Sequence, residues 1–230
     1  LAERIKAQDW MSEATKKAAL EKLSTFYVKV GYPNKWKDLS KLTIDPKKSY
    51  YENVQNCKKF WAEDAIKEKA GKPVDKDQWL MTPQTVNAYY NPTTNEICFP
   101  AGILQYPFFD PKADDAFNYG AIGVVIGHEM THGFDDQGRH YDKDGNMTDW
   151  WTAEDGKNFE ARTGKYADFF SAIKVLPDLY ANGKLTLGEN LADHGGLEVA
   201  FNAFMKTPEA KAGKTIMGFT PEQRFFIAYA

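Results

Sequence analysis

The stretch GAIGVVIGHEMTHG, residues 120–133, decides how this chain is expected to fold. Its first eight residues are apolar or glycine, which predicts a helix buried in the interior. His128 and His132 follow, and residues four apart lie one above the other on a helix face. Both imidazoles can therefore reach one ion, while Glu129, about 100° round the helix, can reach a water molecule beside it. This H-E-x-x-H arrangement is typical of zinc peptidases.

A metal-free alternative exists, because two hydrogen-bonded histidines on a polar face would give the same letters. The apolar run disfavours it, since burying imidazoles without a partner is costly. A third ligand is available in LGENLAD, residues 187–193, where Glu189 and Asp193 share one helix face. One carboxylate can bind zinc while the other orients a histidine. The alternative for Glu189 is a capping box with Thr186.

Two further groups of candidate ligands are weaker. A metzincin would place its third histidine at position 138, which is Gly138, and His140 comes two residues late. His194 lies roughly 100° round the helix from Asp193, which favours a surface or packing role. The D-x-D-G fragment at residues 142–145 invites a calcium-loop reading, although the further carboxylates of that motif are not in place.

Composition excludes several classes of function. The chain has 230 residues, is 43% hydrophobic and carries a formal charge of −3. No long run of one charge is present, so nothing favours nucleic acid or an anionic membrane as a partner. No stretch of 18 or more apolar residues is present, so we expect no membrane span within the chain. Cys57 and Cys98 are too few for a disulfide framework and leave the compartment unsettled.

Periodicity and turn residues predict an α+β fold that is mainly helical. We expect helices at 9–24, 49–69, 114–133, 153–175 and 187–205, a strand at 26–30, and a hairpin from 84–90 and 96–102. No linker is long enough to separate two domains. We therefore expect a single catalytic domain over residues 1–230, and its abrupt ends suggest truncation at both.

Five motifs resemble those of the neprilysin family of zinc metallopeptidases, in the same order and spacing. They are VNAYY at 86–90, FPAGILQ at 99–105, GHEMTHGFDDQGR at 127–139, DWW at 149–151 and LGENLADHGG at 187–196. The resemblance covers nearly the whole chain and is far more specific than the zinc motif alone. It implies a thermolysin-like zincin (gluzincin) catalytic domain with a small edge sheet.

The resemblance also implies the site residues. One Zn²⁺ would be held by His128, His132 and Glu189, with Glu129 as general base. In the family the aspartate at Asp193 is usually described as a proton donor. Its position one turn from Glu189 argues instead for holding His128, and both roles stay open.

Supporting and substrate-binding residues follow from the same resemblance. Asp135 is expected to support His132, although an aspartate at a helix end is an equal alternative. Asn87 and Ala88 would hold the main chain of a peptide by strand addition. The residues implied to line the pocket after the cut are Ile103, Phe108, Val124 and Val125. An apolar pocket predicts cleavage of oligopeptides on the amino side of hydrophobic residues.

The sequence also departs from the family. Full-length members continue with a histidine that stabilises the oxyanion, and no histidine follows His194 here. The chain alone is therefore expected to lack part of the catalytic machinery, and a zinc-bound scaffold without turnover stays an alternative. Apolar residues near 225–230 predict self-association. The cysteines do not match the disulfides of animal members, which favours a bacterial protein, and the family resemblance favours an extracytoplasmic one.

Overall fold

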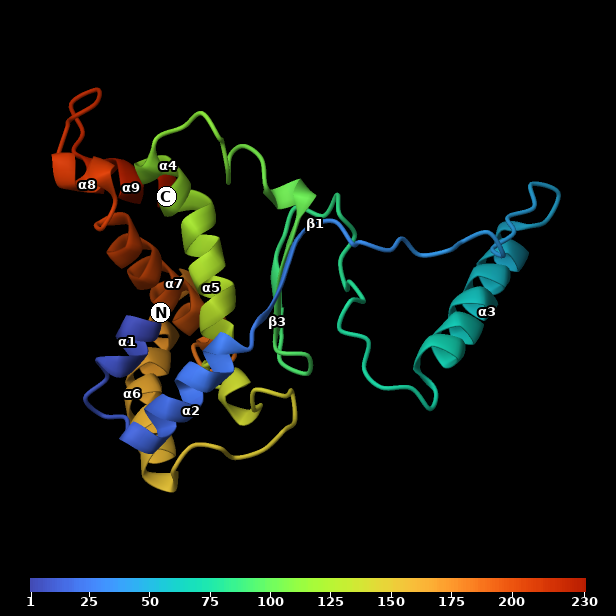
Figure 1. Cartoon of the computed structure of the whole chain (residues 1–230), viewed down its shortest axis with the longest axis horizontal. Helices are drawn as coiled ribbons and strands as arrows, with labels where there is room; N and C mark the ends of the chain where they lie inside the picture. The colour runs from blue at the N-terminus through green and yellow to red at the C-terminus, as the bar shows by residue number, and fades with distance from the viewer. The chain divides into compact units, whose positions relative to one another are not determined.

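The computed structural model describes residues 1–230, and the chain divides into two compact units. The first combines Leu1–Tyr32 with Met81–Ala230, and the second is Pro33–Leu80. Figure 1 labels their helices and strands. Each unit is described by itself below. A single catalytic domain over residues 1–230 stays a prediction.

The first unit opens with helices α1 (Ala2–Lys6) and α2 (Glu13–Ser24). Ser12 begins α2 as its N-cap, since its hydroxyl accepts the backbone N–H of Thr15. The predicted helix at this place is confirmed. One side of α2 is buried although the helix is rich in lysine and glutamate, and its buried residues are Thr15, Ala19 and Lys22.

A three-stranded sheet follows, with strand order β1–β3–β2. Strand β1 (Tyr27–Gly31) runs parallel to β3 (Glu96–Pro100), and β2 (Tyr89–Asn91) forms an antiparallel hairpin with β3. The hairpin is therefore confirmed. Every residue of β3 is buried, because it lies between the other two strands.

The first strand of the hairpin is shorter than predicted, and the expected range 84–90 is wrong at its start. After Pro100 the chain turns into a short 3₁₀ helix, Ala101–Ile103. The register of the hairpin sets residues 84–86 opposite this 3₁₀ turn rather than opposite a strand. The N–H of Thr85 donates instead to the Thr82 carbonyl within a turn, 3.0 Å.

The helix that carries the H-E-x-x-H motif begins where it was expected. Asp114 caps α4 (Asp115–Asn118), a π-helical turn occupies Tyr119–Gly123, and α5 (Val124–His132) continues it. Together they make one helical run, so the prediction over 114–133 is confirmed. π-helical turns inside α-helices are frequent at functional sites.

Helix α7 (Leu187–Phe204) lies along α5, as Figure 1 shows, and confirms the helix expected at 187–205. Glycines let the two helices approach closely. A Cβ on Gly196 would lie 2.6 Å from the backbone nitrogen of His128. A Cβ on Gly127 would lie 2.7 Å from the Gly196 carbonyl oxygen. This close crossing brings the two motifs together.

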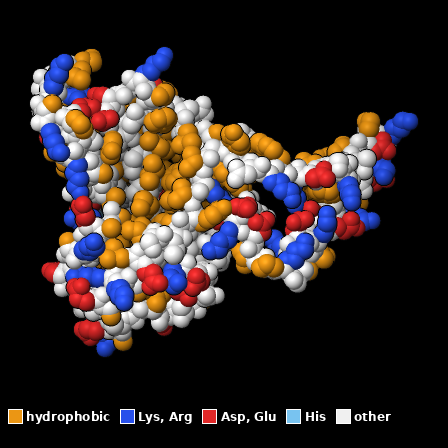
Figure 2. Space-filling view, viewed as in Figure 1, with side chains coloured by type: hydrophobic (Ala, Val, Ile, Leu, Met, Phe, Trp, Pro, Cys, Tyr) orange, Lys and Arg blue, Asp and Glu red, His pale blue; other side chains and the backbone are white.

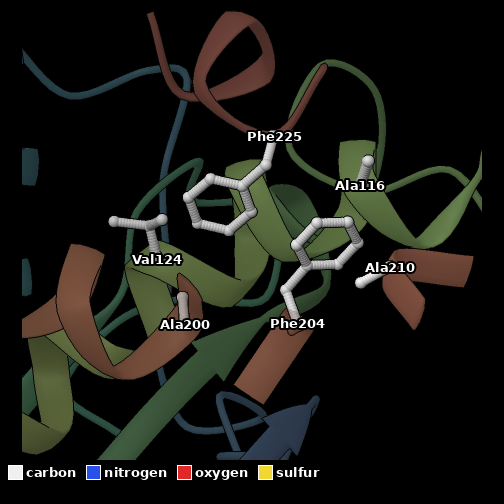
Figure 3. Close-up of a cluster of buried hydrophobic side chains, with 6 residues drawn as sticks. All are labelled: Ala116, Val124, Ala200, Phe204, Ala210 and Phe225. Atoms are coloured by element: carbon white, nitrogen blue, oxygen red, sulfur yellow. The ribbon is translucent and has the colours of Figure 1, made fainter. Parts of the chain in front are cut away.

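The core is divided into clusters. Figure 3 shows one of them, where Phe204 of α7 stacks on Phe225 with ring centroids 5.5 Å apart. Its buried members are Ala116, Val124, Ala200, Phe204, Ala210 and Phe225. A second cluster lies between the sheet and α5 and contains Ala88, Ile97, Phe99, Ile103 and Ile122. These clusters anchor both sides of the metal-motif helix.

The other elements of the first unit are the 3₁₀ turn Gly138–His140, α6 (Ala153–Ser171), β4 (Lys174–Leu176), β5 (Leu179–Tyr180), α8 (Pro208–Ala212) and α9 (Pro221–Tyr229). The helix predicted at 153–175 is too long by four residues. The chain after Ala172 forms the β4–β5 hairpin, whose turn contains Pro177, a residue without a backbone N–H.

The second unit contains α3 (Tyr50–Lys69), which confirms the helix predicted at 49–69. Ser49 and Glu52 form a capping box at its start. No residue of α3 is buried. Across the chain, no helix has both the length and the apolar character needed to span a membrane.

Candidate metal centre

The two histidines of α5 point their outer ring nitrogens at each other. Nε2 of His128 lies 3.0 Å from Nε2 of His132. Their other nitrogens meet carboxylates: His128 Nδ1 is 2.8 Å from Asp193 Oδ1, and His132 Nδ1 is 2.7 Å from Asp135 Oδ2. Since an ionised carboxylate only accepts, each Nδ1 is the donor, and a neutral imidazole held in this way presents the lone pair of its Nε2.

Glu189 completes a triangle with these two nitrogens. Its Oε2 lies 3.3 Å from Nε2 of His128 and 3.7 Å from Nε2 of His132. Ligand atoms in a tetrahedral zinc site, at 2.0–2.1 Å from the metal, are roughly 3.3 Å apart. The three atoms therefore fit one zinc ion.

The alternative role of Glu189, a capping box with Thr186, is not formed. Thr186 is the N-cap of α7 but makes no side-chain cap bond. Its hydroxyl instead accepts from the side-chain amide of Asn190, 2.9 Å, and donates to the Asn182 carbonyl, 3.2 Å. The carboxylate of Glu189 is consequently available to the histidines.

Glu129 is buried beside the histidines, and the side-chain ligand atoms of His128, Glu129 and His132 all lie within 4.8 Å of one another. Burial raises the pKa of Glu129 above its usual value, although both histidines and the backbone N–H of Tyr90 oppose the shift. A carboxylate with a raised pKa is a stronger base than an exposed one.

Asp135 is held rigidly where α5 ends. Besides His132, it accepts the backbone N–H groups of Gln137 at 2.9 Å and Gly138 at 2.6 Å through Oδ1. Burial would lower the pKa of His132, but the hydrogen bond and charge of Asp135, with nearby Glu129 and Glu189, raise it overall. The buried carboxylate is thus a structural partner of this histidine.

A cleft of about 720 Å³ opens over the centre. It is lined by Asn87, Ala88, Tyr89, Tyr90, Pro92, His128, Glu129, His132, Asp135, Asp136, Gln137, Gly138, Lys184, Leu185, Gly188 and Glu189. Three of these lining residues were not predicted from the sequence as site residues, namely Gln137, Lys184 and Leu185. Gln137 lies within the family motif around the histidines, whereas Lys184 and Leu185 belong to a loop without any such signal.

The residues expected to bind substrate are distributed unequally. Asn87 and Ala88 line the cleft, where the side-chain oxygen of Asn87 accepts the N–H of Ala88, 2.9 Å. Ile103, Phe108 and Val125 gather in the cluster that contains Ala88, but Val124 lies in the other cluster, shown in Figure 3. None of these four residues lines the cleft, so their role in a pocket stays a prediction.

The weaker candidate ligands lie elsewhere. His140 meets Asp149 at 3.4 Å, and the ring of His194 packs against Tyr166 with centroids 5.8 Å apart. In the D-x-D-G loop, Asp142 Oδ1 accepts the backbone N–H groups of Asp144 and Asn146, each at 2.9 Å. That carboxylate closes a turn, so the loop offers no sign of an ion.

Similarity to known proteins agrees with this geometry. A family model described as peptidase family M13 matches residues 87–230, and a second model of the same family matches residues 1–33. Human endothelin-converting enzyme 1 is 43% identical over 238 residues, which cover 99% of this chain and 30% of that protein. Neprilysin-11 of Caenorhabditis elegans is 41% identical and is covered over 28% of its length. The chain thus spans about 30% of these relatives.

Solved structures give the same result. The zinc metalloprotease Zmp1 of Mycobacterium tuberculosis, in complex with an inhibitor, superposes with a TM-score of 0.92 at 47% identity, covering 99% of this chain and 35% of that one. PepO of Lactobacillus rhamnosis superposes with a TM-score of 0.84 at 35% identity, with the same two coverages. The predicted fold class and family resemblance are therefore confirmed. This chain belongs to peptidase family M13, a family of zinc metallopeptidases.

Proposed function

We propose that this chain forms the zinc-binding catalytic core of an endopeptidase that hydrolyses oligopeptides. The observation that carries the proposal is the triangle of His128 Nε2, His132 Nε2 and Glu189 Oε2, with sides of 3.0, 3.3 and 3.7 Å, beside the buried Glu129. These three residues would hold one zinc ion. When bound, zinc supplies Lewis-acid activation of a water molecule and of the scissile carbonyl.

Glu129 is the proposed general base. Its burial and raised pKa make it a better proton acceptor than an exposed glutamate. It accepts a proton from the attacking water and passes that proton to the leaving amine of the cleaved peptide. Its position one residue after His128 on α5 keeps its carboxylate near the ligands without adding it to the triangle.

Asp193 and Asp135 orient the imidazoles in this proposal. The distance of 2.8 Å between Asp193 Oδ1 and His128 Nδ1 supports the orienting role. Asp135 makes the matching contact to His132 at 2.7 Å. Donation of a proton to substrate by Asp193 remains the second reading of that residue. An Asp193→Asn change that weakens zinc binding would favour orientation.

Substrate is proposed to lie along β2. This strand is an edge strand of its sheet, with β3 as its neighbour, and an edge strand can accept an extended peptide. Asn87 and Ala88, just before β2, would hold the peptide main chain. Ile103, Phe108, Val124 and Val125 are proposed to favour Phe, Leu, Ile or Met after the cut, and three of them pack in the cluster of Ala88.

A Glu129→Gln variant tests the proposal. Cleavage of a fluorogenic peptide with Phe or Leu after the scissile bond is expected to fall by a factor of about 10²–10⁴. Zinc content should stay near one per chain, because Glu129 is not a ligand. Glu154→Gln, at an exposed position of α6, is the matched control and should leave both values unchanged.

The zinc and cleavage measurements decide between the endopeptidase and its alternatives. Zinc without cleavage in the unaltered chain would favour the alternative of a zinc-bound scaffold, or a need for further segments. Zinc binding below about one ion per ten chains would show that the metal site does not exist, and the proposal would then be wrong. Cleavage that survives Glu129→Gln would exclude Glu129 as the base.

Two further properties are proposals with weaker support. Figure 2 shows hydrophobic side chains gathered on the face where α5 lies, and Ile126 of that helix is 38% exposed. Phe226 and Ile227 of α9 are also exposed. We propose that this exposed apolar surface favours self-association of the chain, which sedimentation would measure.

An extracytoplasmic bacterial setting is also proposed, and it rests on the family resemblance alone.

A further inference from the structure

Lys22 of α2 is a lysine placed entirely inside the protein. Its exposed fraction is 1%, and lysine is almost never this buried unless it is paired. Three aromatic rings surround the ammonium group: Nζ lies 5.8 Å from the ring centroid of Tyr90, 5.6 Å from that of Phe134 and 5.7 Å from that of Trp150. Such a position is costly for a charge and calls for compensating contacts.

The compensation comes from three backbone carbonyls. Nζ of Lys22 donates to the oxygens of Gly133 at 2.7 Å, Gly138 at 2.8 Å and Tyr141 at 2.6 Å. An ammonium group has three hydrogens, and all three are used. Burial lowers the pKa of Lys22 to about 8, while Asp135 and Asp142 oppose the shift, so the group is protonated at neutral pH.

These carbonyls belong to the turn that follows the metal-motif helix. Gly133 caps the end of α5, where the helix dipole favours a positive charge. The turn from Gly133 to Tyr141 contains Asp135, the partner of His132 Nδ1. Lys22 therefore bonds to both ends of the segment that carries this carboxylate.

The lysine is itself held in place. The buried side-chain amide of Asn95, in the hairpin turn before β3, donates to the Lys22 carbonyl at 3.1 Å. Asn95 also accepts the hydroxyl of Tyr90 at 3.0 Å. Helix α2, the hairpin and the turn after α5 thus meet around one ammonium group.

We propose that Lys22 is a positioning residue of the zinc centre, which holds the turn Gly133–Tyr141 so that Asp135 orients His132. The inference rests on the proposed zinc site and extends it to a residue about 110 positions away in sequence. Lys22 makes no bond to the ligand triangle, and of the residues that line the cleft it contacts the Gly138 carbonyl and the ring of Tyr90. It acts through Asp135.

The first test is zinc affinity, measured by competition with a chelator. Lys22→Met keeps an unbranched side chain one atom shorter, and removes the charge and all three donors. Zinc should bind about 10–100-fold more weakly, the usual effect of losing an outer partner of a ligand. Lys17→Met changes the same charge at an exposed position of α2 and should leave the affinity unchanged.

A double-mutant cycle then separates positioning from general destabilisation. If Lys22 acts through Asp135, Lys22→Met should add less than about a twofold loss of affinity once Asp135→Asn is present. Losses that multiply in the double variant would overturn the proposal. The visible spectrum of the cobalt-substituted protein should also shift with Lys22→Met, because the orientation of His132 changes.

Further controls keep the outcomes distinct. If Lys22→Met does not fold, as judged by near-UV circular dichroism, Lys22→Arg replaces it in the cycle. Arginine keeps the charge, but its planar donors cannot match three convergent carbonyls. Unchanged zinc affinity in a folded Lys22 variant would overturn the inference. Cleavage that survives Glu129→Gln would instead overturn the proposed mechanism and leave the affinity result standing.

Discussion

Helices α2 and α3 begin in the same way and then differ. Ser12 caps α2 by accepting the N–H of Thr15, and Ser49 caps α3 by accepting the N–H of Glu52. Both helices are polar and rich in lysine and glutamate. One side of α2 is buried, whereas α3 buries none of its residues.

The difference lies in the partners of the capping residues. The hydroxyl of Ser12 also donates to Asp155 of α6, 143 positions away, and Thr15 donates to the same carboxylate at 2.6 Å. The hydroxyl of Ser49 bonds only within its own first turn, to Glu52. A serine N-cap can therefore begin a helix that is packed into the tertiary structure, such as α2, and also a helix without buried residues, such as α3.

Removing the buried carboxylate of Asp155 should have the largest effect on the difference between α2 and α3. Asp155→Ala leaves the hydroxyls of Ser12, Thr15 and Thr152 without their acceptor. The free energy of unfolding of the first unit should fall by roughly 3 kcal/mol, measured by urea denaturation with tryptophan fluorescence. Asp168→Ala, exposed on the same helix, is the control. A loss below about 1 kcal/mol would mean that the bonds to Asp155 matter little.

Acid should weaken the contact of α2 with Asp155 of α6, and the loss of stability should be somewhat smaller than for Asp155→Ala. Burial alone would raise the pKa of Asp155, but its bonds from Ser12, Thr15 and Thr152 outweigh burial and lower it to about 2. The unfolded value is about 3.9. The carboxylate therefore stabilises the fold fully above pH about 4, and this contribution, about 2 kcal/mol, is lost as the pH falls through about 2.

The check is urea denaturation at several pH values between 5 and 2. An Asp155→Asn variant should lose less stability over this range than the unaltered protein, because it lacks the titrating group. Equal slopes for both proteins would contradict the depressed pKa.

The smallest expected difference separates the two capping serines. Ser12→Ala should cost roughly 2 kcal/mol, because it removes both a cap and a bond to a buried carboxylate. Ser49→Ala should cost about 1 kcal/mol or less, confined to the first turn of α3. Amide hydrogen exchange resolved by residue would show the second change locally and the first across α2 and α6. Equal, local effects would remove the distinction between the helices.

Much of the fold was predictable because its signals are local. The caps at Ser12, Ser49 and Asp114 set where three helices begin, and each helix is found there. The hairpin was predicted from its turn, but its first strand begins at Tyr89 rather than at residue 84. Residues 84–86 could not extend the strand, because the register sets them opposite the 3₁₀ turn that follows Pro100.

The candidate site was predictable in its residues more than in its contacts. The motif spacing and the resemblance to the neprilysin family named His128, His132 and Glu189, and the structure brings their ligand atoms within 3.7 Å of one another. The capping box of Thr186, the alternative role for Glu189, matches its own sequence pattern and is not formed. Lys184 and Leu185 reach the cleft through the path of a loop, which no motif describes.

The sequence by itself determined that His128 and His132 share one face of a buried helix, because four-residue spacing and an apolar run act within a single helix. Only the tertiary structure decided which carboxylate meets which ring nitrogen and why a buried lysine belongs to this centre. Those contacts depend on the crossing of α5 and α7 at Gly127 and Gly196 and on the turn held by Lys22. These contacts follow from the packing of segments that are far apart in the chain.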